Sequence, residues 1–215
     1  MNSPASLPLF QSRVVPVIVV TDPAQAVPMA EALLAGGVDV MEITLRSAAG
    51  LAAIEAVARA VPEMQVGAGT VTRASEVAQV MAAGARFGLS PGSTPGLLAA
   101  VLAAGLPFVP GVASPSEAMA ARDAGFTLMK CFPAAQLGGV EVLNAWGGPH
   151  PELRISPTGR VSQPNMGNIL AHPNVAMVGG SWLTPAAAVK AGDWAQITRL
   201  AREATEAVAA LQISR

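Results

Sequence analysis

Short runs rich in β-branched residues alternate along this chain with alanine-rich stretches of helical length, and this alternation constrains the fold more than any other feature. The eight candidate strands are 14–20, 38–44, 65–69, 87–90, 108–112, 128–131, 153–157 and 175–179. An Ala-Gly pair ends several of the intervening helices, where glycine can adopt the left-handed conformation that stops a helix. These pairs are Ala35-Gly36, Ala83-Gly84, Ala104-Gly105 and Ala124-Gly125.

Strands that alternate with helices pair in parallel, because each helix returns the chain in a right-handed crossover. Eight such units in 215 residues predict an α/β protein with the fold of a (β/α)8 TIM barrel. The alternative is a doubly wound open sheet, since the sequence does not show whether the first strand pairs with the last. No stretch has the composition of a linker. We therefore expect one domain over residues 1–215, with a short N-terminal segment, about residues 1–13, before the first strand.

Composition argues against several classes of partner. Charged residues make up 13% of the chain and the net charge is −1, which offers no basic surface for nucleic acid and favours a small-molecule ligand. The apolar runs are shorter than the roughly 20 residues of a membrane span, and the first residues lack the pattern of a secretory signal. Cys131 is the sole cysteine, which excludes an intrachain disulfide. We expect a cytoplasmic protein with neither a membrane nor a nucleic-acid partner.

Lysine is rare in this chain, and one lysine lies in an unusual place. The chain has two lysines, Lys130 and Lys190, and Lys130 belongs to the apolar run 128–133. An amine shielded from water loses its proton more readily, and a neutral amine is a nucleophile toward a carbonyl carbon. Lys130 is therefore a candidate nucleophile. The alternative is a lysine whose stem packs at a strand end while its ammonium reaches solvent.

Side chains alternate between the two faces of a strand, and this places further polar groups near Lys130. In the second strand Glu42 and Arg46 share one face, and the apolar residues between them share the other. The apolar face must contact the helices, so Glu42 and Arg46 point into the barrel mouth, as do Lys130 and Phe132 in the sixth strand. Three ionisable groups in one pocket favour catalysis. The alternative is a buried Glu42–Arg46 ion pair with Lys130 as a bystander.

Glycine-rich segments end two other strands. The third ends in 67–70, Gly-Ala-Gly-Thr, whose glycines would let the backbone and the Thr70 hydroxyl approach a ligand closely. The eighth ends in 179–181, Gly-Gly-Ser, at the position where backbone amides of such barrels commonly bind phosphate. The segment 158–160 would be its companion after the seventh strand. A plain tight turn is the alternative for 179–181.

The two histidines give no sign of catalysis or metal binding. His150 and His172 each precede a proline, in loops away from the strand ends, so we assign them no catalytic role. No pair of residues has the spacing of metal ligands, so zinc-dependent chemistry lacks its ligands. We therefore expect neither a metal nor a cofactor.

Taken together, the strand ends resemble those of a known family. The matching segments are 15–19 (VPVIV), 42–46 (EITLR), 67–70 (GAGT), 90–92 (SPG), 109–111 (VPG), 130–133 (KCFP), 157–159 (PTG) and 179–182 (GGSW). On these segments, over nearly its whole length, the chain resembles the class I 2-keto-3-deoxy-6-phosphogluconate aldolases, some of which also cleave 4-hydroxy-2-oxoglutarate. The resemblance implies a homotrimer that cleaves this 2-keto acid to pyruvate and glyceraldehyde 3-phosphate without a metal.

The resemblance also implies a role for each matching residue in the chemistry. Lys130 would form the Schiff base with the substrate ketone, and Glu42 would be the general acid and base. Arg46 and Thr70 would hold the substrate carboxylate. Phe132 would pack against the bound pyruvyl group.

Further residues would bind the rest of the substrate, and one of them departs from the family pattern. Pro91 and Thr158 would contact the substrate. The phosphate would bind at Gly159, Arg160, Gly179, Gly180 and Ser181. Where the family usually has Pro-Thr-Gly-Gly, this chain has arginine at position 160. Arginine resists a positive φ, so the phosphate loop could be distorted; alternatively, the guanidinium could contact the phosphate directly.

Other functions remain compatible with these residues. The same chemistry would serve an aldolase for the galactonate epimer or for 4-hydroxy-2-oxoglutarate, because these substrates differ only beyond the reacting carbons. A phosphate-binding barrel isomerase or epimerase would need an acid and a base but no amine nucleophile. An inactive ligand-binding barrel is the alternative outside catalysis, and Arg160 motivates it.

Overall fold

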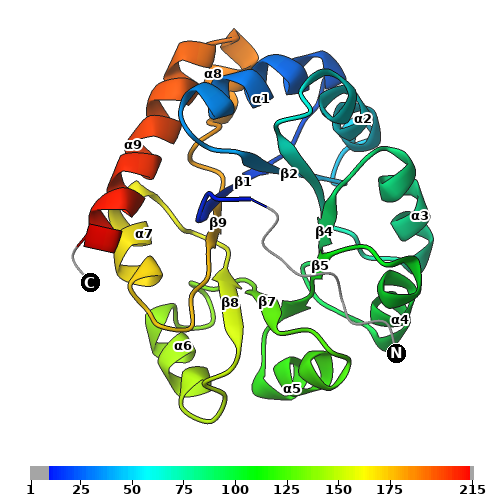
Figure 1. The fold of residues 1–215 in the computed structure, drawn as a ribbon, viewed down its shortest axis with the longest axis vertical. Coiled ribbons are helices and arrows are strands. Elements are labelled where there is room, and N and C mark those ends of the chain that lie inside the picture. The colour runs from blue at the N-terminus through cyan, green and yellow to red at the C-terminus, as the bar shows by residue number, and fades with distance from the viewer. Residues whose placement is uncertain (1–9, 214–215) are drawn as a thin grey trace.

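The alternation of strands and helices predicted from the sequence is confirmed by the computed structural model, which describes residues 10–213. The strands are β1 (Val14–Ile18), β2 (Val40–Thr44), β3 (Gln65–Gly69), β4 (Phe87–Leu89), β5 (Phe108–Val109), β6 (Gly111–Val112), β7 (Leu128–Cys131), β8 (Arg154–Pro157) and β9 (Val178–Gly180). The helices are η1 (Pro23–Gln25), α1 (Ala26–Ala35), α2 (Gly50–Ala60), α3 (Ala74–Ala82), α4 (Pro95–Ala104), α5 (Pro115–Asp123), α6 (Val140–Gly147), α7 (Gln163–Leu170), α8 (Ala186–Ala191) and α9 (Trp194–Ile213). Figure 1 shows the strands in the middle of the molecule with the helices around them.

The strands pair in parallel and form an α/β fold with two sheets. Six strands pair in the order β5-β4-β3-β2-β1-β9, and three pair in the order β6-β7-β8. Isolated parallel bridges, Ile155 with Val175 and Thr158 with Gly179, join the chain around β8 to the chain around β9. Of the expected N-terminal segment, residues 1–9 lie outside the part of the chain that the structure describes.

The fifth predicted strand, 108–112, is divided in two at a proline. Phe108 and Val109 pair with β4, whereas Gly111 and Val112 pair with β7. Pro110 has no N–H to donate to a neighbouring strand. Its carbonyl still accepts a hydrogen bond of 2.8 Å from the backbone N–H of Lys130. The division therefore lies where the chain leaves one sheet and joins the other.

Three of the four predicted Ala-Gly joints have their glycine in the left-handed conformation, with φ of 88° at Gly84, 69° at Gly105 and 100° at Gly125. The prediction is wrong at the first joint, where Gly36 has φ −91° and Gly37 has φ 85°. Gly36 is needed for space rather than for its backbone conformation, because a Cβ at that position would lie 2.4 Å from the Ala201 Cβ of α9. Glycine thus permits α1 and α9 to pack closely.

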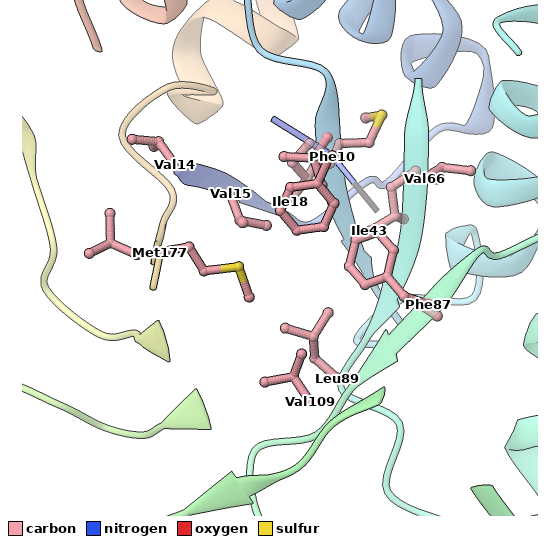
Figure 2. Packing of buried hydrophobic residues seen from close by; sticks show 14 of the residues in the cluster. Phe10, Val14, Val15, Ile18, Ile43, Val66, Phe87, Leu89, Val109 and Met177 are labelled. Carbon is pink, nitrogen blue, oxygen red and sulfur yellow. The ribbon is translucent and has the colours of Figure 1, made fainter. Parts of the chain in front are cut away.

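Apolar side chains pack together along the strands, from Val14 at the start of β1 to Leu89 at the end of β4 (Figure 2). The rings of Phe10, which precedes β1, and Phe87, the first residue of β4, lie 5.4 Å apart between centroids. Gly67 leaves room for this packing, since a Cβ there would lie 2.4 Å from the Phe87 ring. Phe10 and Phe87 therefore pack together beside the start of β4. None of the described helices is long and apolar enough to cross a membrane.

Candidate active site

A pocket of about 830 Å³ opens at the carboxyl-terminal ends of the strands. Its walls come from the ends of β1 and β9, from the segments that follow β2, β7 and β8, and from α8. Eight predicted site residues line it: Arg46, Phe132, Thr158, Gly159, Arg160, Gly179, Gly180 and Ser181. Segments far apart in the sequence thus meet at one cavity, at the end of the sheet where such folds place their sites.

Lys130 and Glu42 form a buried ion pair beside this pocket. The Lys130 Nζ donates a hydrogen bond of 2.9 Å to Glu42 Oε1, and the two residues are 4% and 1% exposed. The Lys130 Nζ also lies 5.8 Å from the centroid of the Phe132 ring, which lines the pocket. The alternative of a Glu42–Arg46 pair with Lys130 as a bystander is wrong. Arg46 is exposed and makes no salt bridge with any described residue, whereas Glu42 contacts the amine.

Glycine makes room for the carboxylate on the neighbouring strand. A Cβ at Gly69 would lie 2.2 Å from Glu42 Oε1. In the parallel register Thr44 faces Gly69, and its hydroxyl donates a hydrogen bond of 2.9 Å to the Ile18 carbonyl, which ties β2 to β1. The sequence suggested that the glycines of β3 let a ligand approach the backbone. The structure shows instead that they accommodate side chains of the protein itself, Phe87 at Gly67 and Glu42 at Gly69.

Two buried polar atoms at this site have no hydrogen-bond partner among the described residues, Glu42 Oε2 and Thr158 Oγ1. An unpaired polar atom in a protein interior is unfavourable, because it loses its hydrogen bonds to water and gains none in exchange. Both atoms belong to predicted site residues. The free carboxylate oxygen is a ready proton acceptor, and the free hydroxyl can donate or accept. Both are therefore available for hydrogen bonds to a ligand.

The loop after β8 has a backbone conformation suited to anions. Gly159 and Arg160 have φ of 109° and 57°. Asn165 holds this turn: its side-chain amide donates to the Arg160 carbonyl at 3.0 Å, and its Oδ1 accepts from the Ser162 N–H at 2.8 Å. Arginine therefore adopts the left-handed conformation that the sequence analysis expected it to resist. The loop keeps that shape, and the Arg160 side chain lines the pocket.

The loop after β9 approaches that turn closely. A Cβ at Gly179 would lie 2.3 Å from Thr158 Oγ1, and one at Gly180 would lie 1.9 Å from the Trp182 ring. Only glycine fits at both places. Ser181 follows and is exposed at the pocket.

Thr70 and Pro91 do not line the pocket, and their predicted contacts with substrate stay predictions. Thr70 has φ 61° and follows Gly69, so it comes directly after the strand position that contacts Glu42. The Pro91 loop crosses Gly111, where a Cβ would lie 2.3 Å from the Pro91 carbonyl carbon. Gly111 is the register partner of Lys130. The Pro91 loop thus lies beside the strand that carries the amine.

Two serine side chains fix the loop that contains Pro91. Ser90 belongs to the matching segment 90–92, and Ser93 was not predicted to have a role. The Gly111 N–H donates to Ser90 Oγ at 3.0 Å, and the Ser93 hydroxyl donates to the Gly111 carbonyl at 3.0 Å. Ser90 and Ser93 also contact each other at 3.3 Å. These bonds hold the Pro91 loop against β6.

Lys190, in the last turn of α8, lines the pocket together with Val189. No role was predicted for Lys190 from the sequence. Lysine is rare in this chain, which was a signal, but Lys190 lies outside the predicted strands and so was not expected at the strand ends.

The remaining candidates for chemistry lie elsewhere or are unreactive. Burial raises the pKa of the Cys131 thiol to about 11, so it is protonated at neutral pH. His172 is buried, and its Nε2 contacts Asn144 Oδ1 at 3.0 Å in a cluster away from the pocket. Within residues 10–213, no three His, Cys, Asp or Glu side chains are grouped so as to hold a metal ion.

Comparison with known proteins identifies the family. Residues 8–200 match the family of aldolases described as KDPG and KHG aldolase. A 2-dehydro-3-deoxy-phosphogluconate aldolase from Pseudoalteromonas atlantica is 49% identical over 201 residues, which cover 94% of each chain. The KHG/KDPG aldolase of Escherichia coli K12 is 50% identical over 198 residues, which cover 92% of this chain and 93% of that protein.

A solved structure agrees with these relatives. The crystal structure of KDPG aldolase from Legionella pneumophila, with pyruvate captured at low pH as a covalent carbinolamine intermediate, is 44% identical to this chain. The two structures match with a TM-score of 0.87, over 89% of this chain and 93% of that chain. The chain therefore belongs to the KDPG and KHG aldolase family.

Proposed function

We propose that this protein is a class I aldolase that cleaves 2-keto-3-deoxy-6-phosphogluconate to pyruvate and glyceraldehyde 3-phosphate. The observation that carries the proposal is the buried pair of Lys130 and Glu42, joined at 2.9 Å beside the pocket at the strand ends. A nucleophilic amine next to a carboxylate is the pair that Schiff-base chemistry requires. Relatives that are 47 to 49% identical to this chain bear the name of this activity.

The reaction begins at Lys130. Glu42 Oε1, 2.9 Å from the Lys130 Nζ, takes the ammonium proton. The neutral amine then attacks the C2 ketone of the substrate and forms a carbinolamine. The proton returns to the C2 hydroxyl, which leaves as water, and a cationic iminium remains. This cation is the electron sink for the next step.

Cleavage follows between C3 and C4. Glu42 removes the proton of the C4 hydroxyl as this bond breaks, and the bonding electrons move into the iminium to give an enamine. The aldehyde product leaves with its phosphate. Protonation of the enamine at C3 restores an iminium, and water releases pyruvate and the free amine. The free Oε2 of Glu42, unpaired among the described residues, supports its role as base.

The charged ends of the substrate fit opposite parts of the pocket. Arg46, exposed and without a salt bridge among the described residues, offers a planar fork for the substrate carboxylate, with Thr70 as its predicted partner. Phe132 packs against the pyruvyl group, and Pro91 and Thr158 contact the substrate.

Backbone groups form the part of the pocket that binds the substrate phosphate. The phosphate binds to the amides of the Gly159-Arg160 turn after β8 and of segment 179–181 at the end of β9, and to the Ser181 hydroxyl.

Reduction of the imine with borohydride in the presence of pyruvate tests the mechanism. Borohydride converts an imine into a stable secondary amine, and only Lys130, Lys190 and the N-terminal amine compete for it. We expect a pyruvate-dependent adduct that peptide mapping locates on Lys130. The Lys190→Ala variant should keep this adduct, and Lys130→Arg should lose it. No adduct in the parent, or one on Lys190 alone, would overturn the proposal.

A second substrate is supported by one comparison. The Escherichia coli relative, 50% identical, is named KHG/KDPG aldolase. Cleavage of 4-hydroxy-2-oxoglutarate uses the same bonds and the same two residues. Values of kcat/KM for both substrates and for the galactonate epimer would rank them. Isomerase activity without a pyruvate adduct would favour the isomerase alternative, and absence of any turnover would favour an inactive barrel.

We also propose that the two sheets close into one (β/α)8 barrel and that the protein is a cytoplasmic homotrimer. Closure is supported by the parallel bridges between the chain around β8 and β9, and by the passage of the chain from β5 to β6 through Pro110. The trimer rests on the resemblance of the sequence to the aldolase family, and the location rests on the single cysteine, which suits a reducing compartment. Light scattering coupled to size exclusion would give the oligomeric state.

A further inference from the structure

The pocket carries positive charge in its walls. Arg46, Arg160 and Lys190 line it, and no Asp or Glu within residues 10–213 lines it with them. All three are exposed, and none makes a salt bridge with any described residue. Three unpaired cations around one cavity therefore favour an anionic ligand.

The three cations belong to different parts of the pocket. Arg46 follows β2, whereas Arg160 follows β8 and Lys190 lies on α8, which comes after β9. In the sheet β1 separates β2 from β9, and the bridge from Thr158 to Gly179 joins the loops after β8 and β9. Arg160 and Lys190 thus flank the glycine turns, and Arg46 lies on the other side of β1. This distribution suits a ligand with one anionic group at each end.

We infer that Lys190, with Arg160, forms a side-chain anion subsite at the distal end of the pocket, which selects substrates with a phosphate on the aldehyde portion. This inference rests on the proposed aldolase function. Backbone amides and the Ser181 hydroxyl bind phosphate oxygens but carry no net charge. A phosphate monoester carries about 1.5 to 2 negative charges at neutral pH, which two cations can balance.

Lysine suits this position because its ammonium is a compact charge on a flexible stem. Lys190 is exposed at the pocket wall and free to move toward the ligand. An exposed cation acts by attraction at a distance, and it contributes more to capture of the substrate than to the chemical step. Its effect should therefore appear in KM and should weaken as salt screens the charge.

Steady-state kinetics of Lys190→Ala would test the inference. For the phosphorylated substrate we expect KM to rise about two- to fivefold, the range of an exposed charge interaction, while kcat stays within twofold. For unphosphorylated 2-keto-3-deoxygluconate, KM should not change. Inhibition by inorganic phosphate should weaken in parallel, and the difference between parent and variant should shrink in high salt. Lys190→Glu should raise KM further.

Arg154→Ala is the matched control. Arg154 is the first residue of β8, at the opposite ends of the strands; it is exposed and has no salt bridge among the described residues. The variant changes net charge by the same amount as Lys190→Ala but should leave KM unaltered. Equal effects of the two substitutions, or an unchanged KM and phosphate inhibition in Lys190→Ala, would overturn the subsite.

Trapping with pyruvate separates this inference from the proposed function. The parent and Lys190→Ala should form the adduct on Lys130 equally well, because pyruvate has no phosphate. Failure of the parent to form that adduct would refute the aldolase mechanism. An intact adduct with unchanged KM in the variant would refute only the role of Lys190.

Discussion

A buried amine is unfavourable unless it has a partner, and the Lys130 site supplies one at the position where chemistry needs it. The 2.9 Å contact with Glu42 compensates for the loss of water around both groups. Glu42 Oε2 has no hydrogen bond among the described residues. The Phe132 ring lies next to the Lys130 amine and also lines the pocket. The same two residues thus hold each other in place and, in the proposed mechanism, provide the nucleophile and the base. Removing one partner should disturb both stability and catalysis.

Replacement of Glu42 by glutamine separates these functions. The amide oxygen of Gln can still accept the hydrogen bond from Lys130, but it cannot take a proton. We expect Glu42→Gln to lower kcat about 10²- to 10⁴-fold, the usual contribution of a general acid or base. Trapping of pyruvate on Lys130 should also slow, because Glu42 moves the proton during imine formation, but it should fall less than kcat, because it breaks no carbon–carbon bond. Measurements of turnover and of adduct formation on the same preparation would show the difference.

The exposed Glu55→Gln variant is the control, since it removes a carboxylate that pairs with Arg59 on the surface of α2, away from the pocket. It should have the kcat of the parent. Turnover of Glu42→Gln at the parental rate would contradict the role of Glu42 as base.

At the scale of elements, the strands position Lys130 and Glu42, and the loops that follow the strands supply other residues of the pocket. The turn after β8 contains a non-glycine residue, Arg160, with φ 57°. A left-handed conformation is unfavourable for such a residue by about 1 to 2 kcal/mol. The chain maintains it through the two hydrogen bonds of Asn165. This strain suggests that the guanidinium has a use that outweighs it.

Two substitutions at position 160 distinguish strain from binding. Arg160→Gly should raise stability by about 1 kcal/mol, because glycine tolerates positive φ. It should also raise KM for the phosphorylated substrate by about two- to fivefold, since the guanidinium is lost. Arg160→Ala should raise KM to the same extent without the gain in stability. Thermal unfolding and steady-state kinetics would report both effects. Equal kcat/KM for the phosphorylated substrate in Arg160→Gly and the parent would contradict phosphate binding by this side chain.

The sequence predicted the elements well where local rules decide them. The alternation along a strand correctly placed Glu42 and Lys130 on facing surfaces, because the period of a strand is fixed. The strand pattern did not predict the division of the fifth strand at Pro110. Whether the missing N–H of a proline interrupts a strand depends on which strands lie beside it, and the local sequence does not show this. The prediction also assigned the left-handed conformation to Gly36 instead of Gly37, because close packing of α1 against α9 is not visible in the local sequence.

At the scale of the whole molecule, the site depends on contacts that no local pattern contains. Glu42 and Lys130 are 88 residues apart in the chain, and they meet only because β2 and β7 face each other across the interior. Lys190 reaches the pocket from α8, which follows the loop after β9, where Gly180 packs against Trp182. Strand alternation and the family resemblance both pointed to Lys130 and Glu42 as the predicted catalytic pair. Neither pointed to Lys190, because its place at the pocket depends on how the helices are arranged in space.

A polar cluster around His172, remote from the pocket, makes the stability of the whole fold depend on pH. His172 is 8% exposed. Its Nδ1 accepts a hydrogen bond of 3.2 Å from the Asn174 N–H, and its Nε2 lies 3.0 Å from Asn144 Oδ1. The acceptor at Nδ1 requires a neutral ring. Burial lowers the pKa of His172 below its usual value, so the folded protein binds the proton less readily than the unfolded chain does.

This difference in proton binding gives the direction of the pH dependence. An unfolded histidine takes up its proton near pH 6.5. The contribution of His172 to stability is therefore complete above that pH, and it is lost as pH falls toward the lower pKa of the folded state, by at most about 1.4 kcal/mol per pH unit. We expect the free energy of unfolding, measured with urea, to decrease between pH 7.5 and 5.5. In His172→Gln the decrease should be smaller, because glutamine does not titrate. Equal slopes in the parent and His172→Gln would show that other groups control the pH dependence, and that the buried cluster tolerates a charged ring.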